Sequence, residues 1–257
     1  MQNHSKRRRG IMSYPRFFVD FDAIGERTVL LDGESAQHIS RSLRMREGER
    51  IVVCDPDGKE YECILEGFSS ESVTAVIDDV RRNVSEPCYK AVVYQACPKS
   101  DKMDSIVQKA VELGAGEIVC FMSDRCVARY DGKGFEKKCT RWQKIALEAA
   151  KQSGRGVVPK VRWLPDLKSV LGEMNAPDVC FMCYEDEDGL TLKKLVRGAA
   201  ENACYRFIIG PEGGFSEKEA QTCRENGVFT VGLGKRILRT ETASGYVLAC
   251  LSYEKEL

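Results

Sequence analysis

The stretch IIGPEGGFSEKE (residues 208–219) and the stretch VGLGKRILRTETA (residues 231–243) decide the fold of this chain. Each starts as an apolar strand, passes through glycines and ends in a helix. Ser216 and Glu219 stand at the spacing of a capping box, which places a helix start there and makes GPEGG the strand-to-helix turn. Thr240 is predicted to cap the terminal helix. Such units indicate a parallel sheet, whose ligands bind beyond the carboxyl ends of the strands.

The same alternation extends back to about residue 86. The predicted strands are KAVVYQA (90–96), EIVCFM (117–122), GVVPKV (156–161), DVCFMCY (178–184), YRFIIG (205–210) and VFTVGL (228–233). The predicted helices begin at Ser100, Phe135, Leu167, Glu217 and Glu241. Strands that alternate with helices predict an α/β domain over residues 86–257, with a mostly parallel sheet covered on both faces.

Residues 15–85 have a different pattern, with short strands and tight turns. The predicted strands are FFVDF (17–21), TVLLD (28–32), RIVVCD (50–55), YECILEGF (61–68) and SVTAVIDDV (72–80). Asp-Gly pairs between apolar runs favour hairpins. One helical stretch, SAQHISRSLRMREG (35–48), interrupts the strands. About five strands and one short helix predict a small β-barrel. The basic leader, residues 1–14, is expected to be disordered, and Met12 is an alternative start.

Composition excludes several classes of protein. The chain has 257 residues, of which 43% are hydrophobic and 30% charged, as expected of a soluble globular protein. No run reaches the roughly 18 apolar residues that a membrane span needs, and the N-terminus does not resemble a signal peptide. We therefore expect a cytoplasmic protein. Net charge is zero, but residues 99–162 carry 14 basic against 8 acidic side chains, which permits a polyanionic partner.

The cysteines and histidines argue against a metal site. The twelve cysteines are mostly scattered singly through apolar segments, where a free thiol acts as a small hydrophobe. Cys180 and Cys183 form a CxxC pair, but a structural zinc site needs a second pair of ligands. The only histidines are His4 and His38, which disfavours a catalytic triad. We expect reduced thiols and no metal.

The loop of the second deciding stretch suggests a pocket. Leu233, Ile237 and Leu238 are apolar residues in a segment that must be a loop, and loops are normally polar. Beside glycines, they indicate a site for a flat, partly apolar ligand such as adenine. Arg239 and Glu241 flank it, as in a site that handles a charged group. The alternatives are a tight turn at GPEGG, and packing of the loop on a neighbour with Arg239 in a surface ion pair.

Six segments together carry a family resemblance. The two deciding stretches, with HISRSLRM (38–45), IVQKAVELG (106–114), SDRC (123–126) and RWQKIALEAAKQSGR (141–155) in the same order, closely resemble the RsmE family. Its members are small-subunit ribosomal RNA uridine N3-methyltransferases of the SPOUT superfamily. The resemblance implies an N-terminal PUA-like β-barrel and a C-terminal SPOUT-type α/β domain with a deep trefoil knot. It also implies S-adenosylmethionine in the knot and a homodimer whose interface forms the active site.

We therefore predict a methyltransferase that uses S-adenosylmethionine to modify N3 of a uridine in small-subunit (16S) ribosomal RNA. The alternatives are a non-catalytic RNA-binding protein and a SPOUT methyltransferase that acts at another RNA position. The predicted catalytic residues are Arg239, Glu241 and Glu212. The predicted cofactor residues are Tyr184, Ile209, Gly210, Pro211, Glu212, Gly213, Gly214, Leu233, Gly234, Ile237, Leu238 and Thr240. The predicted RNA contacts are Arg41, Arg44, Arg46, Lys99, Lys102, Arg125 and Arg155.

Overall fold

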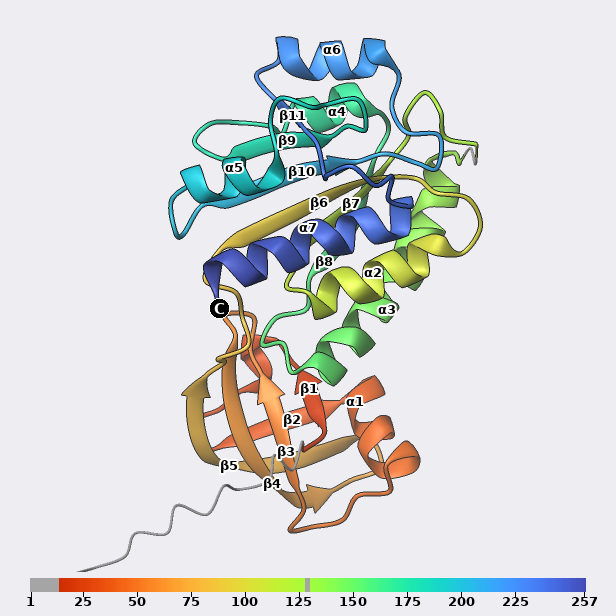
Figure 1. The fold of residues 1–257 in the computed structure, drawn as a ribbon. Helices are drawn as coiled ribbons and strands as arrows, with labels where there is room; N and C mark the ends of the chain where they lie inside the picture. Colours follow the sequence, from red (N-terminus) through yellow and green to blue (C-terminus); the bar gives the residue numbers. More distant parts are fainter. Residues whose placement is uncertain (1–13, 128–129) are drawn as a thin grey trace, which may run out of the picture. The chain divides into compact units, whose positions relative to one another are not determined.

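The computed structural model describes residues 14–127 and 130–257 (Figure 1). The predicted leader, residues 1–14, therefore lies outside the described residues apart from Tyr14. The chain divides into two compact units, the first ending at Val84 and the second beginning at Ser85. Within the described ranges, no helix has both the length and the apolar character needed to cross a membrane.

The first unit is a mixed, five-stranded half-barrel. Its elements are β1 (Arg16–Phe18), the 3₁₀-helix η1 (Phe21–Ala23), β2 (Thr28–Asp32), α1 (Gly33–Gln37), the π-helical turn η2 (His38–Ser42), β3 (Arg50–Cys54), β4 (Lys59–Phe68) and β5 (Ser72–Arg82). The strand order is β1-β3-β4-β5-β2. Strand β1 runs parallel to β3, and the other neighbours are antiparallel. Alternate residues such as Val29 and Leu31 are buried in the core of this unit, as the period of a strand requires.

The predicted helix over residues 35–48 is shorter than expected. It ends with η2 at Ser42, because Arg44 adopts a positive φ of 54° that no right-handed helix tolerates. Ile39 is buried as expected, whereas Leu43 is 41% exposed. Arg41, Arg44 and Arg46 therefore lie on a π-turn and an irregular segment.

The second unit is an α/β domain with a six-stranded sheet. Its elements are β6 (Lys90–Ala96), α2 (Lys102–Glu112), β7 (Glu117–Phe121), α3 (Gly132–Ser153), β8 (Lys160–Leu164), α4 (Leu167–Leu171), β9 (Val179–Cys183), α5 (Leu192–Gly198), β10 (Cys204–Ile209), α6 (Glu217–Glu225), β11 (Phe229–Val231) and α7 (Thr240–Lys255). The strand order is β11-β9-β10-β6-β7-β8, and every pairing is parallel. The predicted parallel sheet is confirmed.

The helices pack on the sheet through apolar faces. Helix α7 contacts α2 on one side and α5 on the other, and lies against β6 and β10 (Figure 1). Helix α3 packs on α2 and β8. In α2 the buried residues recur at helical spacing, from Met103 through Ile106 and Ala110, so one face of the helix enters the core. The carboxyl ends of β9, β10 and β11 stay open for a site.

The strand predicted over residues 156–161 is displaced toward the C-terminus. Strand β8 begins only at Lys160. The backbone amides of Gly156 and Val157 donate hydrogen bonds to the carboxylate of Glu86, at 2.8 and 3.2 Å. Those amides are therefore bound to a side chain and make no ladder. Pro159 has no amide hydrogen to add to one.

Candidate functional site

A cavity of about 560 Å³ lies where β9, β10 and β11 end. Its lining comes from four places: the start of α2, the segment after β9, the GPEGG turn after β10, and the loop between β11 and α7. The lining residues are Lys102, Cys183, Tyr184, Glu185, Asp188, Ile209, Gly210, Pro211, Glu212, Gly214, Phe215, Leu233, Gly234, Lys235, Arg236, Ile237, Leu238, Arg239, Thr240 and Ala243. This is the location that the two deciding stretches indicate.

Of the predicted cofactor residues, Gly213 alone is not part of this lining. A Cβ at Gly213 would lie 3.4 Å from Cβ of Arg125. The Arg125 guanidinium donates a 2.9 Å hydrogen bond to the Gly213 carbonyl. Gly213 therefore faces the loop after β7, and its role is to let that loop approach.

Thr240 joins the two cavity loops and does not cap α7. The N-cap position of α7 is Arg239, which makes no side-chain capping bond, and Thr240 is the first helical residue. The Thr240 hydroxyl donates a 2.6 Å hydrogen bond to the Gly210 carbonyl and accepts one of 2.9 Å from Nε2 of Gln95. Thr240 is 5% and Gln95 0% exposed. The capping prediction was wrong because the hydroxyl has a long-range partner.

Two features of Gly214 favour glycine. Its φ is +63°, and a Cβ there would lie 2.5 Å from Oε1 of Glu185. The Glu185 carboxylate therefore lies directly against the GPEGG turn at the cavity. Beside it, the Tyr184 hydroxyl donates a 2.8 Å hydrogen bond to Glu217, and this bond raises the pKa of Tyr184 to about 12.

Gly232 marks a close approach between two chain segments. A Cβ at Gly232 would lie 2.2 Å from the carbonyl oxygen of Glu187. The Gly232 amide donates a 2.9 Å hydrogen bond to the Leu190 carbonyl. The loop after β9 and the end of β11 therefore pass each other in contact, where only glycine fits. The trefoil knot that the family resemblance implies stays a prediction.

Lys102 holds the two predicted catalytic carboxylates. Its Nζ lies 3.0 Å from Oε1 of Glu212 and 3.3 Å from Oε2 of Glu241. Burial alone would raise the pKa of Glu212, but the hydrogen bond from Lys102 and the backbone amide of Lys99 outweigh it and lower that pKa. The backbone amide of Glu241, then Lys102 and Arg239, lower the pKa of Glu241. Both carboxylates are therefore poor proton acceptors at neutral pH.

Arg239 lies at the N-terminal end of α7 and lines the cavity. Its side chain is exposed, and among the residues described here it forms no ion pair within 4.0 Å. The sequence predicted that Arg239 faces the pocket, and its place in the lining agrees. No carboxylate in the described part of the chain pairs with it, and the neighbouring Glu241 is bound by Lys102.

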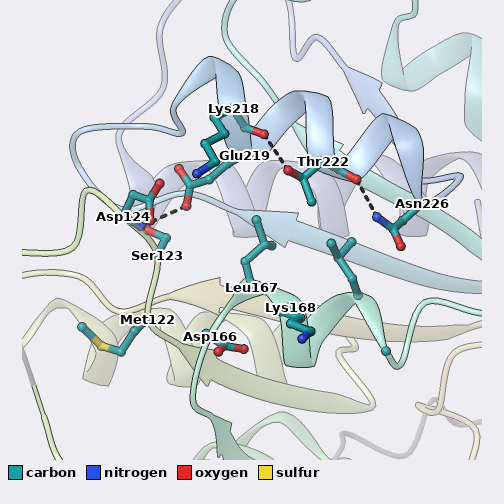
Figure 2. A pocket seen from close by; sticks show the side chains of 12 residues that line it. Met122, Ser123, Asp124, Asp166, Leu167, Lys168, Lys218, Glu219, Thr222 and Asn226 are labelled. Carbon is teal, nitrogen blue, oxygen red and sulfur yellow. Dashed lines mark hydrogen bonds between the residues drawn. The ribbon is translucent and has the colours of Figure 1, made fainter.

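A larger hollow, of about 630 Å³, lies between α4 and α6 (Figure 2). Its carboxylates already have structural partners. Glu219 accepts a hydrogen bond from the Asp124 amide and closes the predicted capping box with Ser216. Asp166 caps α4. These groups stabilise local structure, so we assign the site to the smaller cavity, where glycines and charged groups converge.

Comparison with known proteins identifies the family of this chain. A family model described as an RNA methyltransferase domain matches residues 84–252, and one described as an RNA methyltransferase PUA domain matches residues 31–78. The ribosomal RNA small subunit methyltransferase E of Bacillus subtilis (strain 168) is 36% identical over 234 residues, covering 90% of this chain and 91% of that protein. This chain belongs to the ribosomal RNA small subunit methyltransferase E family.

Solved structures of similar proteins lead to the same family. The Neisseria gonorrhoeae ribosomal RNA small subunit methyltransferase E, solved with S-adenosylmethionine bound, has a TM-score of 0.81 and 31% identity, covering 94% of this chain and 98% of that one. The putative methyltransferase Lpg2936 of Legionella pneumophila, also in complex with S-adenosylmethionine, has a TM-score of 0.81, 28% identity and the same coverage.

In this methyltransferase E family member, the predicted RNA contacts fall into two groups. Arg41, Arg44 and Arg46 are exposed in the first unit, and Lys99 and Arg125 are exposed in the second. All five side chains are available to a partner, although Arg125 also binds the Gly213 carbonyl.

Arg155, which was predicted to contact RNA, has a structural role instead. Its side chain is buried, at 4% exposure, and forms a two-point ion pair with Glu86 at 2.8 and 2.9 Å. It also donates hydrogen bonds to the carbonyls of Val111 and Ala115 at the end of α2. Arg155 is therefore structural and closed to RNA. Lys102 is likewise engaged, with Glu212 and Glu241.

Several cavity residues were missed by sequence reasoning. Glu185, Asp188, Phe215, Lys235, Arg236 and Ala243 line the cavity. Glu185 had a signal, because it directly follows a predicted strand in Cys183-Tyr184-Glu185. Lys235 and Arg236 stand inside the second deciding stretch. No local sequence pattern marks Asp188, which lies at the cavity because of the path of the loop after β9.

Proposed function

We propose that this chain methylates N3 of a uridine in small-subunit ribosomal RNA with S-adenosylmethionine as the methyl donor. The observation that carries the proposal is the cavity formed by the two deciding stretches in a member of this family. The Neisseria relative, solved with S-adenosylmethionine, supports the choice of donor. The relatives are named as small-subunit ribosomal RNA methyltransferases, which supports the choice of substrate.

The cavity suits S-adenosylmethionine in size and chemistry. Its volume of about 560 Å³ is within the usual range for a small-molecule site, roughly 300–1,000 Å³. Leu233, Ile237 and Leu238 offer apolar contacts to an adenine ring, and the glycines of the GPEGG turn allow the backbone to approach the ligand closely. The Glu185 carboxylate, beside Gly214, offers an anionic partner for the positive charges of the ligand.

The donor supplies an electrophilic methyl group, and the protein has to prepare the acceptor. A uracil carries a proton on N3, so this nitrogen becomes nucleophilic only when the proton leaves and negative charge spreads to O2 and O4. Arg239 lines the cavity and has no ion pair within the described ranges, so it is the cation suited to stabilise that charge. Glu212 and Glu241 have lowered pKa values, so we assign the proton to solvent water and not to either carboxylate.

We assign RNA docking to the first unit and transfer to the second, as domains of residues 15–85 and 86–257. The match of residues 31–78 to a PUA domain of RNA methyltransferases supports this division. Arg41, Arg44 and Arg46 are exposed there, and arginine forks suit phosphate groups.

We also propose a cytoplasmic homodimer. Val247, Leu248 and Leu251 are buried within their own unit, so these apolar residues of α7 do not require a partner. Tyr246 and Tyr253 are 37% and 70% exposed and lie two helical turns apart on one face. Light scattering should give the mass of two chains, and an active monomer would contradict the dimer.

The test of the activity is methyl transfer to ribosomes that lack the modification. Small subunits and free small-subunit RNA from cells without the enzyme are incubated with the protein and labelled S-adenosylmethionine. Mass mapping should find N3-methyluridine at one position. RNA binding without transfer would favour a non-catalytic binder, and a methyl group on another atom or RNA would favour a methyltransferase of different specificity.

A further inference from the structure

Lys102 connects three segments of the cavity through one charged group. It is the first residue of α2, and its Nζ contacts Glu212 in the GPEGG turn and Glu241 in the first turn of α7. The Lys102 side chain is 31% exposed, and the two glutamate side chains are 26% and 23% exposed. The hydrogen bond that Lys102 donates to Glu212, with a further contribution from Glu241, raises the pKa of Lys102, so the ammonium stays charged.

The two carboxylates differ in how strongly they depend on this lysine. Glu212 is also held by the backbone amide of Lys99, at 3.1 and 3.3 Å from its two oxygens. Oε2 of Glu241 is buried and, in the described part of the chain, has no hydrogen bond of good geometry. Its 3.3 Å ion pair with Lys102 therefore compensates its charge. Without Lys102, Glu212 keeps the Lys99 amide, whereas Glu241 keeps its own backbone amide but loses its ion pair.

Arg239 is the next cation available to Glu241. The two residues are separated by Thr240 alone at the start of α7, and the charge of Arg239 already lowers the pKa of Glu241. Besides Lys102, Glu212 and Arg239, the charged residues of the cavity lining are Glu185, Asp188, Lys235 and Arg236, and Glu241 itself is not part of that lining. A Glu241 released from Lys102 would turn to Arg239, because the charge of Arg239 already acts on Glu241 and opposite charges attract.

We propose that Lys102 is a positioning residue, which holds Glu241 and so leaves Arg239 unpaired for the substrate. This inference deepens the proposed function and rests on it. It also gives the lysine a role other than RNA contact. Arg239 supplies the positive charge that the reaction needs, and it stays free because Lys102 already pairs with the neighbouring Glu241.

The experiment compares four variants with wild type in the methylation assay. Lys102→Met should lower kcat more than tenfold and change the KM for S-adenosylmethionine less than threefold. Lys102→Arg, which keeps the charge, should stay within fivefold of the wild-type kcat. The double variant Lys102→Met with Glu241→Gln should recover at least fivefold over Lys102→Met, because the amide cannot neutralise Arg239. Lys109→Met, on an exposed face of the same helix, is the matched control and should keep wild-type kcat.

Two results would overturn the proposal. One is a Lys102→Met variant with wild-type kcat, and the other is a double variant no more active than Lys102→Met. An inactive wild-type protein would instead refute the proposed function. In that case a double-mutant cycle between Lys102→Met and Glu241→Gln, followed by urea unfolding, still decides whether the ion pair exists. Strictly additive effects would reject the pair on which the inference rests.

Discussion

Replacing Arg155 by methionine tests whether this side chain is structural or binds RNA. The guanidinium makes two hydrogen bonds to Glu86 and two to backbone carbonyls at the end of α2. A methionine side chain keeps much of the length of arginine and removes all four hydrogen bonds. Loss of one partner of a buried ion pair costs about 3–5 kcal/mol. The Glu86 side chain is 28% exposed and keeps its hydrogen bonds from two backbone amides. We therefore expect a loss of unfolding free energy at the low end of this range, about 3 kcal/mol.

Urea unfolding of the full chain, followed by tryptophan fluorescence, measures this loss. Both tryptophans, Trp142 and Trp163, lie in the second unit and report on the unit that contains Arg155. With a typical urea slope of 1–3 kcal/mol/M, the midpoint should fall by about 1–3 M. Lys151→Met is the control, because Lys151 forms only a surface pair with Glu148, which is 67% exposed, and such pairs contribute little.

The pH dependence provides a second readout for the same pair. Burial alone would raise the pKa of Glu86, but Arg155 and two backbone amides outweigh it and lower that pKa. The folded pKa is thus below the unfolded value of about 4.3. The stabilisation is present above that value and is lost as the pH falls through the folded pKa. The difference between wild type and Arg155→Met should therefore shrink in acid. A variant as stable as wild type that binds RNA more weakly would refute our interpretation.

Three further predictions concern the cavity. Arg239→Ala should lower the methylation rate more than about tenfold, which corresponds to about 1.4 kcal/mol of transition-state stabilisation, and should change cofactor affinity less. Arg239→Lys should recover part of the rate. A wild-type rate in Arg239→Ala would show that Arg239 has no part in the mechanism. Gly214→Ala should weaken cofactor binding in calorimetry, because the added Cβ displaces the Glu185 carboxylate. The control is Gly227→Ala, at a glycine with φ +76° and open space around it. It should have a similar backbone strain of about 1–2 kcal/mol and normal cofactor affinity. Thr240→Val should lower stability by about 1–3 kcal/mol, since it removes two buried hydrogen bonds of about 0.5–1.5 kcal/mol each, while Gln95 keeps its own bonds to the carbonyls of Gly210 and Ala96. It should also weaken cofactor binding, and equal affinity would show that the hydroxyl does not hold the loops.

The order and type of the main elements could be predicted because local signals were strong. The capping box at Ser216 correctly predicted the start of α6, and the helix predicted from Leu167 begins at that residue. Local patterns failed where a distant group competes for the backbone. The amides of Gly156 and Val157 are bound by Glu86, which lies about seventy positions away in the sequence, so their apolar run could not become a strand.

Site residues show the same division between local and distant causes. The glycines and apolar loop residues could be named because their unusual placement is visible in the sequence. The partners of a charged side chain were not visible, since any lysine or arginine in a basic segment looks alike. Lys102, Arg125 and Arg155 were all predicted to contact RNA, yet the structure gives them a pair of carboxylates, a backbone carbonyl and a buried glutamate.

Two sets of side-chain interactions, called ties below, connect the cavity loops, one through Thr240 and the other through Lys102. Their chemistry suits different tasks. The buried tie is neutral, running from Gln95 through the Thr240 hydroxyl to the Gly210 carbonyl. Hydrogen bonds away from water are little affected by salt or an approaching phosphate, so this tie can fix the shape of the cavity. The half-exposed tie through Lys102 is ionic and responds to nearby charge. Because it keeps Glu241 occupied, it governs how much positive charge Arg239 presents, while the neutral tie keeps the cavity itself in place.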